Sequence, residues 1–325
     1  MRRALITGVA GQDGSLLAEL LLEHGYEVFG IVRDNGSGRY PNLDAIRDRV
    51  ELMTANLLDQ SSLVAALEAC RPDEVYNLAA PSFVPMSWDQ PVKTAEFAAV
   101  GATALLEATR TSHPGARFYQ ASSSEIFGEP LERPQNEQTR LAPLTPYGVA
   151  KAYAHFIVSS YRVRYGLFAC SGILYNHESP RRPLSFVTRK VAHGAASIAL
   201  GLSDQLHLGN LDARRDWGYA ADYVRAMWLM LQQDEPGDYV VATGATHSVR
   251  DLVRIAFERV GVDWRRVVRV DEALQRGKAE LHDLVGDASK AREQLGWAPS
   301  LDFEGLVHLL VDSDLGELRA AESAA

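Results

Sequence analysis

The segment Ala4-Leu5-Ile6-Thr7-Gly8-Val9-Ala10-Gly11-Gln12-Asp13-Gly14 establishes the architecture of the N-terminal part of the chain. Its first four residues predict a short buried strand, and the apolar period of residues 15–24 predicts a helix that stops at Gly25. Glycines between a strand and a helix let the backbone approach a diphosphate, whose charge then rests on the helix N-terminus. A second strand at residues 27–32 completes a βαβ unit, so the segment predicts a dinucleotide site.

Strands continue to alternate with helices up to about residue 174. The patterns predict strands at residues 50–54, 74–78, 117–121 and 169–174, and helices at 60–70, 94–111 and 146–165. This alternation is typical of an α/β fold with a Rossmann-type, doubly wound parallel sheet.

The pattern changes after about residue 176. A helix at 186–200 is expected to leave the sheet, whereas strands at 206–209 and 238–242, which flank a helix at 220–233, are expected to return to it. Beyond residue 248 we expect a helix, a strand near 266–270, a charged loop at 275–281, a last helix at 303–311 and a frayed tail at 317–325. The sequence therefore predicts an NADP-binding domain of residues 1–175 and 206–243, and a smaller C-terminal substrate-binding lobe of residues 176–205 and 244–325.

Tyr147 and Lys151 are the strongest indication of chemistry. At a spacing of four residues a phenol and an ammonium share one helix face, where the cation can lower the pKa of the phenol toward that of a useful general base. Ser123 and Glu125 lie just upstream, and Glu125 adds a second acid or base that hydride transfer alone does not require. The combination predicts alcohol oxidation followed by elimination.

Each of these patterns also has an ordinary structural explanation. A Tyr-X3-Lys pair occurs by chance on amphipathic helices, and residues 122–125 fit a helix-capping box. Gly128 and Pro130 would interrupt a helix that began there, so a loop that presents Ser123 and Glu125 is the better interpretation.

The ends of the strands suggest which cofactor is bound. NAD-binding proteins usually carry an acidic side chain after the second strand, whereas an arginine accommodates a 2′-phosphate. Here Arg33 follows Val32, which favours NADP, although the adjacent Asp34 could take the acidic role. Asn56 and Leu57 are expected to meet the adenine, and residues 78–80, including Leu78 and Ala80, to pass beneath the nicotinamide. Ordinary packing at strand ends is the alternative explanation.

Composition narrows the classes of partner. The chain of 325 residues has a net charge of −9 at pH 7, so we expect neither nucleic acid nor an anionic membrane as a partner. It has no apolar run of about 18 residues, the length that spans a membrane. Its nine histidines show no metal-binding spacing, so no metal site is expected. Cys70 and Cys170 show no metal or redox motif, and we expect buried thiols in a reducing cytoplasm.

Taken together, these features resemble the extended short-chain dehydrogenase/reductase family and, within it, the GDP-mannose 4,6-dehydratase family. The likeness extends from residue 4 to about residue 314. It rests on residues 8–14, 123–125, 176–182, 186–190 and 215–218, together with Tyr147 and Lys151. The resemblance implies a cytoplasmic lyase of deoxysugar biosynthesis that acts on a nucleotide sugar, GDP-mannose, with NADP as cofactor. It also implies a homodimer or homotetramer, assembled through the helices at 94–111 and 146–165.

The resemblance implies roles for individual residues. Tyr147 would be the base and Lys151 its electrostatic partner, which also holds the nicotinamide ribose, while Ser123 would hydrogen-bond the sugar O4 and Glu125 would act at C5 and C6. The cofactor is expected to meet Gly8, Gly11, Gln12, Asp13, Gly14, Arg33, Asn56, Leu57, Leu78, Ala80, Tyr147, Lys151, His177 and Arg182. The nucleotide sugar is expected to meet Ser82, Asn176, Lys190, Arg215 and Arg276. Family members usually have threonine, aspartate and glutamine where this chain has Ser123, Asn56 and Pro81.

The resulting hypothesis is an internal redox cycle. Hydride leaves C4 for NADP⁺ as Tyr147 takes the O4 proton, Glu125 removes the C5 proton and helps expel the C6 hydroxyl as water, and the hydride returns to C6. A nucleotide-sugar reductase or epimerase of the same family is the alternative, and it would need Tyr147 and Lys151 but not Glu125. A non-catalytic nucleotide-binding protein would be expected to have lost these residues, and all of them are present.

Overall fold

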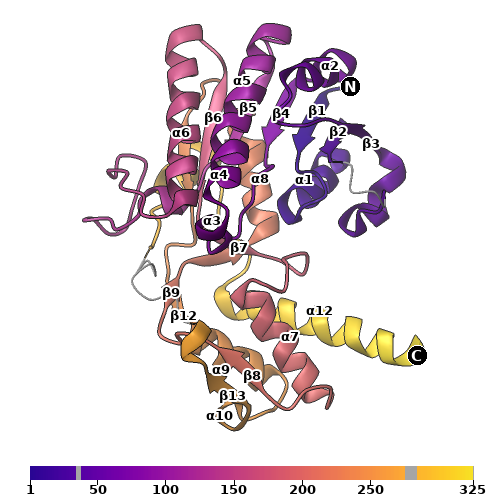
Figure 1. The fold of residues 1–325 in the computed structure, drawn as a ribbon, viewed down its shortest axis with the longest axis vertical. Helices are drawn as coiled ribbons and strands as arrows, with labels where there is room; N and C mark the ends of the chain where they lie inside the picture. The colour runs from indigo at the N-terminus through magenta and orange to yellow at the C-terminus, as the bar shows by residue number, and fades with distance from the viewer. Residues whose placement is uncertain (34–37, 275–283, 325) are drawn as a thin grey trace.

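The computed structural model describes residues 1–33, 38–274 and 284–324. Within them a parallel sheet of seven strands has the order β11-β6-β5-β4-β1-β2-β3 (Figure 1). The strands are β1 (Arg3–Thr7), β2 (Glu27–Val32), β3 (Val50–Thr54), β4 (Glu74–Asn77), β5 (Arg117–Ala121), β6 (Ala169–Leu174) and β11 (Asp238–Val241). The order reverses between β1 and β4, which is where open α/β sheets bind ligands. The predicted doubly wound fold is confirmed.

Helices cover both faces of this sheet because the strands are apolar on both sides. Ala4 and Ile6 of β1 point toward α1 (Gln12–Glu23) and α8 (Ala220–Met230). Leu5, between them, points toward the opposite layer. That layer consists of α2 (Gln60–Cys70), α5 (Gly101–Ser112) and α6 (Pro146–Tyr165).

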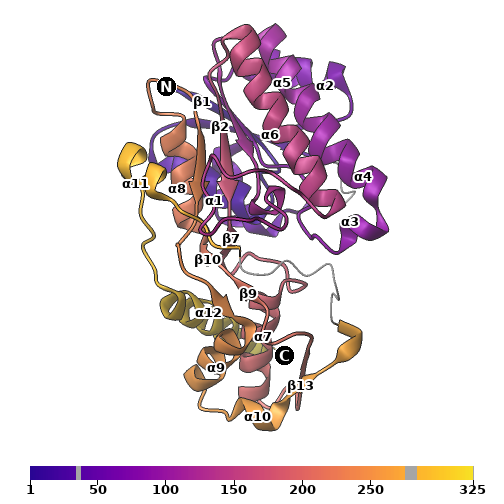
Figure 2. The same cartoon turned by 90° about the vertical axis from the view of Figure 1, so that its left-hand side faces the viewer.

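A second core lies below the sheet in both ribbon views (Figure 2). It is built from α7 (Val187–Ala199), α9 (Val249–Arg259), α12 (Phe303–Ala324) and the two-strand pair of β8 (Leu206–Leu208) with β13 (Val268–Val270). The remaining small elements are β7 (Asn176–Glu178), β9 (Arg214–Arg215), β10 (Trp217–Tyr219), β12 (His247–Ser248), α3 (Met86–Asp89), α4 (Pro91–Ala95), α10 (Trp264–Val267), α11 (Ser289–Leu295) and short 3-10 turns at 41–49, 124–126 and 272–274. The pairs β7–β10 and β9–β12 join the two parts.

Three predicted elements were wrong in position or extent. The strand at 206–209 does not return to the main sheet but pairs with β13, because Leu206 and Leu208 are buried in the second core. The last helix does not end at residue 311 with a frayed tail but continues to Ala324. The helix predicted at 94–111 is interrupted by a π-helical turn at Glu96–Val100. The charged loop predicted at 275–281 lies outside the described residues.

In the part of the chain that the structure describes, no helix combines the length and apolar character needed to cross a membrane.

Candidate functional site

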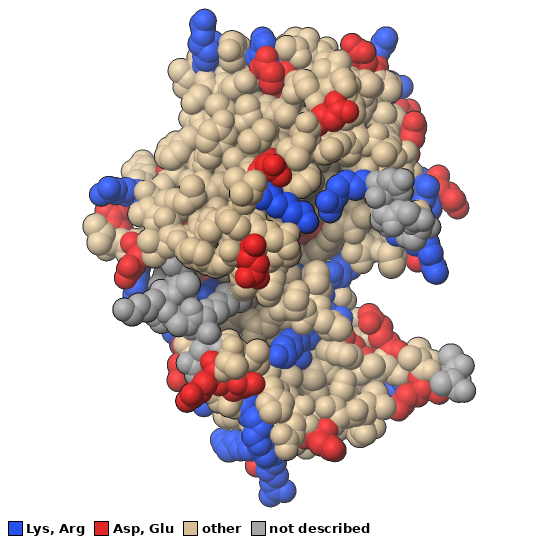
Figure 3. All heavy atoms as spheres, viewed as in Figure 1, with Lys and Arg blue, Asp and Glu red and all other residues tan. Residues whose placement is uncertain are grey.

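A cavity of about 1220 Å³ lies between the carboxyl edge of the sheet and the second core. Figure 3 shows the molecule hollowed there, with Lys and Arg side chains around the opening. Nearly all residues predicted to form the site line it. They are Gly8, Gly11, Gln12, Asp13, Gly14, Arg33, Leu57, Leu78, Ala80, Ser82, Ser123, Glu125, Tyr147, Lys151, Asn176, His177, Arg182, Lys190 and Arg215. The sequence therefore identified residues from both parts of the chain that meet in one cavity.

Among the predicted residues that the structure describes, Asn56 does not line the cavity. Asn56 is exposed, and its side-chain oxygen accepts a hydrogen bond of 3.1 Å from the backbone of Leu58, so it shapes the turn after β3. Arg276 lies outside the described residues, as does Asp34, the alternative to Arg33. Arg33 itself lines the cavity at the end of β2, with its guanidinium 5.5 Å from the centre of the Phe97 ring.

The glycine turn after β1 is a cradle that side chains would fill. Gly8 has φ +72°, in the left-handed region that favours glycine, and a Cβ there would lie 3.0 Å from the backbone of Ala79. A Cβ on Gly14 would overlap the Gly8 carbonyl and lie 2.6 Å from Val9 Cα. The turn thus brings bare backbone to the N-terminus of α1, as diphosphate binding requires.

Tyr147 and Lys151 lie on the buried face of α6. The Thr145 hydroxyl caps this helix by accepting from the backbone of Gly148 at 2.9 Å, and Pro146 follows it, so that Tyr147 falls in the first turn. Lys151 donates to the carbonyl of Ala121 at the end of β5, at 2.8 Å. Burial lowers the pKa of this amine to about 8.

The phenol of Tyr147 differs from expectation. Burial raises its pKa above the ordinary value of 10.0, and Glu125 raises it further, while a hydrogen bond with Ser123 opposes the shift. Arg182 also lowers the pKa of this phenol, while the Lys151 ammonium donates its hydrogen bond to the carbonyl of Ala121 rather than to the phenol. Ionisation of Tyr147 therefore needs positive charge beyond that of Lys151 alone.

Ser123 and Glu125 are presented by a short turn after β5, as expected from the loop interpretation. The hydroxyl of Ser123 accepts from the backbone of Glu125 at 3.2 Å and begins a 3-10 turn at Ser124–Ile126. The Thr145 hydroxyl lies 3.4 Å from Glu125 Oε2 and links this turn to α6. The cap of α6 and the carboxylate of Glu125 are thus held together.

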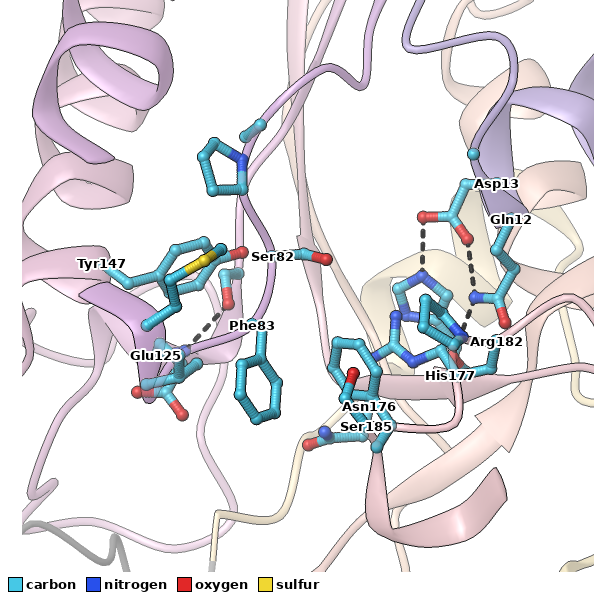
Figure 4. Close-up of a pocket in the computed structure, with 18 of the residues that line it drawn as sticks. Gln12, Asp13, Ser82, Phe83, Glu125, Tyr147, Asn176, His177, Arg182 and Ser185 are labelled. Carbon is cyan, nitrogen blue, oxygen red and sulfur yellow. Dashed lines mark hydrogen bonds and ion pairs between the residues drawn. The ribbon is translucent and has the colours of Figure 1, made fainter. Parts of the chain in front are cut away.

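Asp13 and His177 join the glycine turn to β7 (Figure 4). Asp13 Oδ2 lies 2.9 Å from His177 Nε2, and Asp13 Oδ1 accepts from Gln12 Nε2 at 2.9 Å. The same Gln12 amide donates to the His177 carbonyl at 3.1 Å, and its oxygen accepts from Ser179 at 2.9 Å. Residues expected to touch the cofactor are thus also tied to one another.

Four residues that line the cavity were not predicted from the sequence as site residues: Phe83, Glu178, Phe186 and Thr188. The guanidinium of Arg182 lies 3.7 Å from the centre of the Phe186 ring, whose edge meets Phe83 with ring centres 5.4 Å apart. Glu178, almost fully buried, lies 3.2 Å from Arg182 Nε and accepts from Thr188 at 2.6 Å. Glu178 lies within residues 176–182, which carry part of the family resemblance, and this segment is the sequence signal that could have identified it.

Among the described residues, no group of three or more histidine, cysteine, aspartate or glutamate side chains is arranged to hold a metal ion.

Comparison with known proteins gives the family. A family model described as GDP-mannose 4,6 dehydratase matches residues 5–310. GDP-mannose 4,6 dehydratase 1 of Arabidopsis thaliana is 47% identical over 324 residues, which cover 96% of this chain and 89% of the relative. The human GDP-mannose 4,6 dehydratase is 45% identical over 347 residues, which cover 99% of this chain and 93% of the relative.

A solved structure agrees with these matches at the level of the fold. The UDP-glucose 4-epimerase of Thermus thermophilus, solved in complex with NAD, superposes with a TM-score of 0.85 at 29% identity and covers 97% of this chain and 99% of its own. Epimerases and dehydratases share this fold, so the family rests on the nearly full-length sequence match. The chain belongs to the GDP-mannose 4,6-dehydratase family.

Proposed function

We propose that this chain converts GDP-mannose to GDP-4-keto-6-deoxymannose and water, which makes it a lyase of deoxysugar biosynthesis. The observation that carries the proposal is that Ser123, Glu125 and Tyr147 line the same cavity as the glycine turn. A reductase or an epimerase has no evident use for Glu125, whereas an elimination needs an acid and base at C5 and C6.

NADP is the proposed cofactor. The glycine turn fits a dinucleotide diphosphate, because Cβ atoms would fill it, and Arg33 lines the cavity after β2, where a 2′-phosphate would be met. The epimerase solved with NAD supports a nicotinamide cofactor, and Arg33 supports the phosphorylated form. Gly8, Gly11, Gly14, Leu57, Leu78 and Ala80 would line its binding path. When bound, the cofactor supplies a hydride acceptor that later returns the hydride.

Tyr147 is the proposed base for the sugar O4 proton. Its phenol is buried, and Ser123 shares a hydrogen bond with it, so a hydroxyl placed between them would be oriented by both groups. Lys151, held against Ala121, contributes a nearby positive charge and hydrogen-bonding capacity toward a ribose. Since burial raises the pKa of Tyr147, the phenolate that accepts this proton forms only where nearby positive charge stabilises it.

Glu125 is the proposed base at C5 and acid at the C6 hydroxyl. Its partly exposed carboxylate lines the cavity beside Tyr147 and Thr145. Formation of a ketone at C4 makes the C5 proton acidic. The carboxylate can then accept that proton and pass it to the departing hydroxyl. When the hydride returns to C6, C5 takes up a proton from solvent, and Tyr147 releases the O4 proton, so no net acid is consumed.

The nucleotide diphosphate of the substrate would lie toward the second core. Asn176, Lys190 and Arg215 line that side of the cavity, while Ser82 lines the side nearer the sheet. Arginine and lysine are the residues that hold diphosphates, and their placement gives an acidic chain a local cationic surface. Arg276 stays a predicted contact.

Location and assembly follow as further proposals. We assign residues 1–175 and 206–243 to the cofactor part and residues 176–205 and 244–325 to the substrate part, with two exceptions. β8 is buried in the second core, whereas Ala288, Ala291, Leu295 and Trp297 are buried in the core of the main sheet. Free, buried Cys70 and Cys170 suit a cytoplasmic location. Val149, Tyr153 and Phe156 are exposed on α6, and these apolar side chains suit a homodimer or homotetramer.

Product analysis tests the function. The purified chain is mixed with GDP-mannose, without added reduced cofactor, and the sugar is followed by mass spectrometry and proton NMR. A dehydratase gives loss of one water, a new C6 methyl group and a C4 ketone. Consumption of the sugar only when NADPH is supplied in equal amount would instead identify a reductase.

A further inference from the structure

Both ring nitrogens of His177 face hydrogen-bond acceptors. Nε2 lies 2.9 Å from the Asp13 carboxylate and Nδ1 lies 2.7 Å from the carbonyl oxygen of Tyr175. A neutral imidazole carries one N–H and one lone pair, so it can donate to only one of these oxygens. A carbonyl oxygen cannot donate, and the Asp13 carboxyl is kept ionised. Only the imidazolium satisfies both contacts.

The surroundings of His177 agree with a positive charge. The ring stacks on Tyr223 of α8, with centres 4.6 Å apart and an angle of 19° between the planes, so the aromatic face lies against the cation. Burial and the nearby Arg182 each lower the pKa of His177, but the charge and hydrogen bond of Asp13 outweigh them and raise it. Burial by itself would raise the pKa of Asp13. The charge and the hydrogen bond of His177, together with Gln12 and Arg182, outweigh burial and lower that pKa to about 2.

Asp13 would be unfavourable at this position without its partner. It lies in the first turn of α1 and lines the cavity beside the glycine turn, where the helix N-terminus would otherwise attract a diphosphate. An unpaired carboxylate there would repel an anionic ligand. Its charge also reaches the catalytic groups, because Asp13 contributes to raising the pKa of Tyr147 and that of Lys151.

We propose that His177 is a constitutive imidazolium whose main task is to neutralise Asp13, so that the Asp13–His177 pair fastens the glycine turn to β7 without repelling the dinucleotide. The inference rests on the proposed dinucleotide site, and it makes Asp13 and His177 positioning residues. Two hydrogen bonds from Gln12 and one to it from Ser179 brace the same junction. A direct ionic contact between His177 and the cofactor would give the histidine a different role, and the two roles predict different results in a double mutant.

Dinucleotide affinity separates these roles. NADPH binding to the full chain is titrated by fluorescence for wild type, His177→Gln, Asp13→Asn and the double variant. Neutralisation predicts that H177Q weakens binding on the order of tenfold and that adding D13N to it restores most of the loss. A double variant that binds as weakly as H177Q, or more weakly, would overturn the proposal. His155→Gln is the matched control, since His155 is also buried near a carboxylate, 3.9 Å from Asp238, yet does not line the cavity.

The protonation state can be measured without any ligand. Nitrogen-15 NMR of the histidine rings, assigned by comparison with H177Q, reports whether both His177 nitrogens carry protons. We expect the imidazolium pattern at pH 7 in the wild-type chain and a lower titration midpoint in D13N. A neutral His177 ring at pH 7 would contradict the proposal. Failure of the wild type to bind NADPH would overturn the proposed function instead, and the NMR result would still decide the ion pair.

Discussion

The ammonium of Lys151 lies 5.7 Å from the centre of the Tyr147 ring and donates its hydrogen bond to the carbonyl of Ala121, at the end of β5. The lysine therefore lies beside the base without a direct bond to the phenol oxygen. Its charge is nevertheless sensitive to pH, because burial lowers the pKa of the amine to about 8.

The activity is expected to decline above about pH 8 as the Lys151 ammonium loses its proton. The group is charged below its pKa and neutral above it, so its support of the Tyr147 phenolate is lost on the alkaline side. Lys151→Arg keeps a positive charge at every accessible pH and should move this decline upward. The pH dependence of kcat/KM for both proteins is the measurement, and circular dichroism confirms that both remain folded. An alkaline decline at the same pH in K151R would assign it to another group.

Removing the base should stop the first chemical step. Tyr147→Phe deletes only the hydroxyl of a side chain that is 7% exposed, so the fold should persist. We expect the rate of keto-sugar formation to fall about 10²- to 10⁴-fold, the usual contribution of a general acid or base. GDP-mannose binding, measured by calorimetry, should change little. Retention of near wild-type turnover in Y147F would exclude Tyr147 as the base.

Replacing Glu125 should block elimination while sparing substrate binding. Glu125→Gln keeps the size and removes the carboxylate, so the C5 proton has no acceptor; a loss of about 10²- to 10⁴-fold is expected. Incubation in deuterated water distinguishes the steps, because wild type should place deuterium at C5 of the product and E125Q should release little product at all. Full product formation by E125Q would mean that another group removes the C5 proton.

The cradle at the start of α1 should tolerate no side chain. A Cβ on Gly14 would overlap the Gly8 carbonyl, so Gly14→Ala should displace the turn and cost about 1–3 kcal/mol of dinucleotide binding or of folding free energy. Gly115→Ala is the matched control, since a Cβ there meets nothing within 4 Å. NADPH titration and thermal unfolding of both variants measure the effect. Equal NADPH affinity and equal thermal stability of G14A and G115A would show that the turn can accommodate a side chain at position 14.

The Asp13–His177 pair should give stability a defined pH window. With a folded pKa of about 2 against an ordinary 3.8, Asp13 contributes about 2 kcal/mol above pH 4, which is lost as the pH falls toward 2. The pKa of His177 is raised, so its contribution is complete below pH 6.5 and is lost as the pH rises through its folded pKa. Urea unfolding of wild type and Asp13→Asn across this range should show a difference that shrinks at both ends. A difference independent of pH would contradict the pair.

Local patterns predicted most of the sheet and the catalytic helix. β2, β3, α2, β5, α6 and β6 have the predicted limits, because each is a regular apolar pattern with clear turn or cap residues at its ends. β8 was misplaced because a short apolar run carries no information about which sheet it joins. α12 was predicted too short because its last turns are polar and lack an apolar period, although they remain helical.

The sequence predicted most of the residues that line the cavity but not the contacts between their side chains. Asp13 and His177 are 164 residues apart, and no local sequence pattern predicts that their side chains meet. The contacts of Arg182 with the Phe186 ring and with the buried Glu178 likewise depend on how the loop after β7 folds back. The shift of the Tyr147 pKa depends on burial, which spacing along a helix does not reveal.

Transfer of isotope within one substrate molecule tests the proposed reaction most directly. GDP-mannose carrying deuterium at C4 is converted by the chain in ordinary water, without added NADPH, and the product is examined by NMR and mass spectrometry. The internal cycle predicts that the C4 deuterium appears in the C6 methyl group of the keto-sugar. A methyl group without deuterium, or deuterium released into a free reduced cofactor, would contradict it.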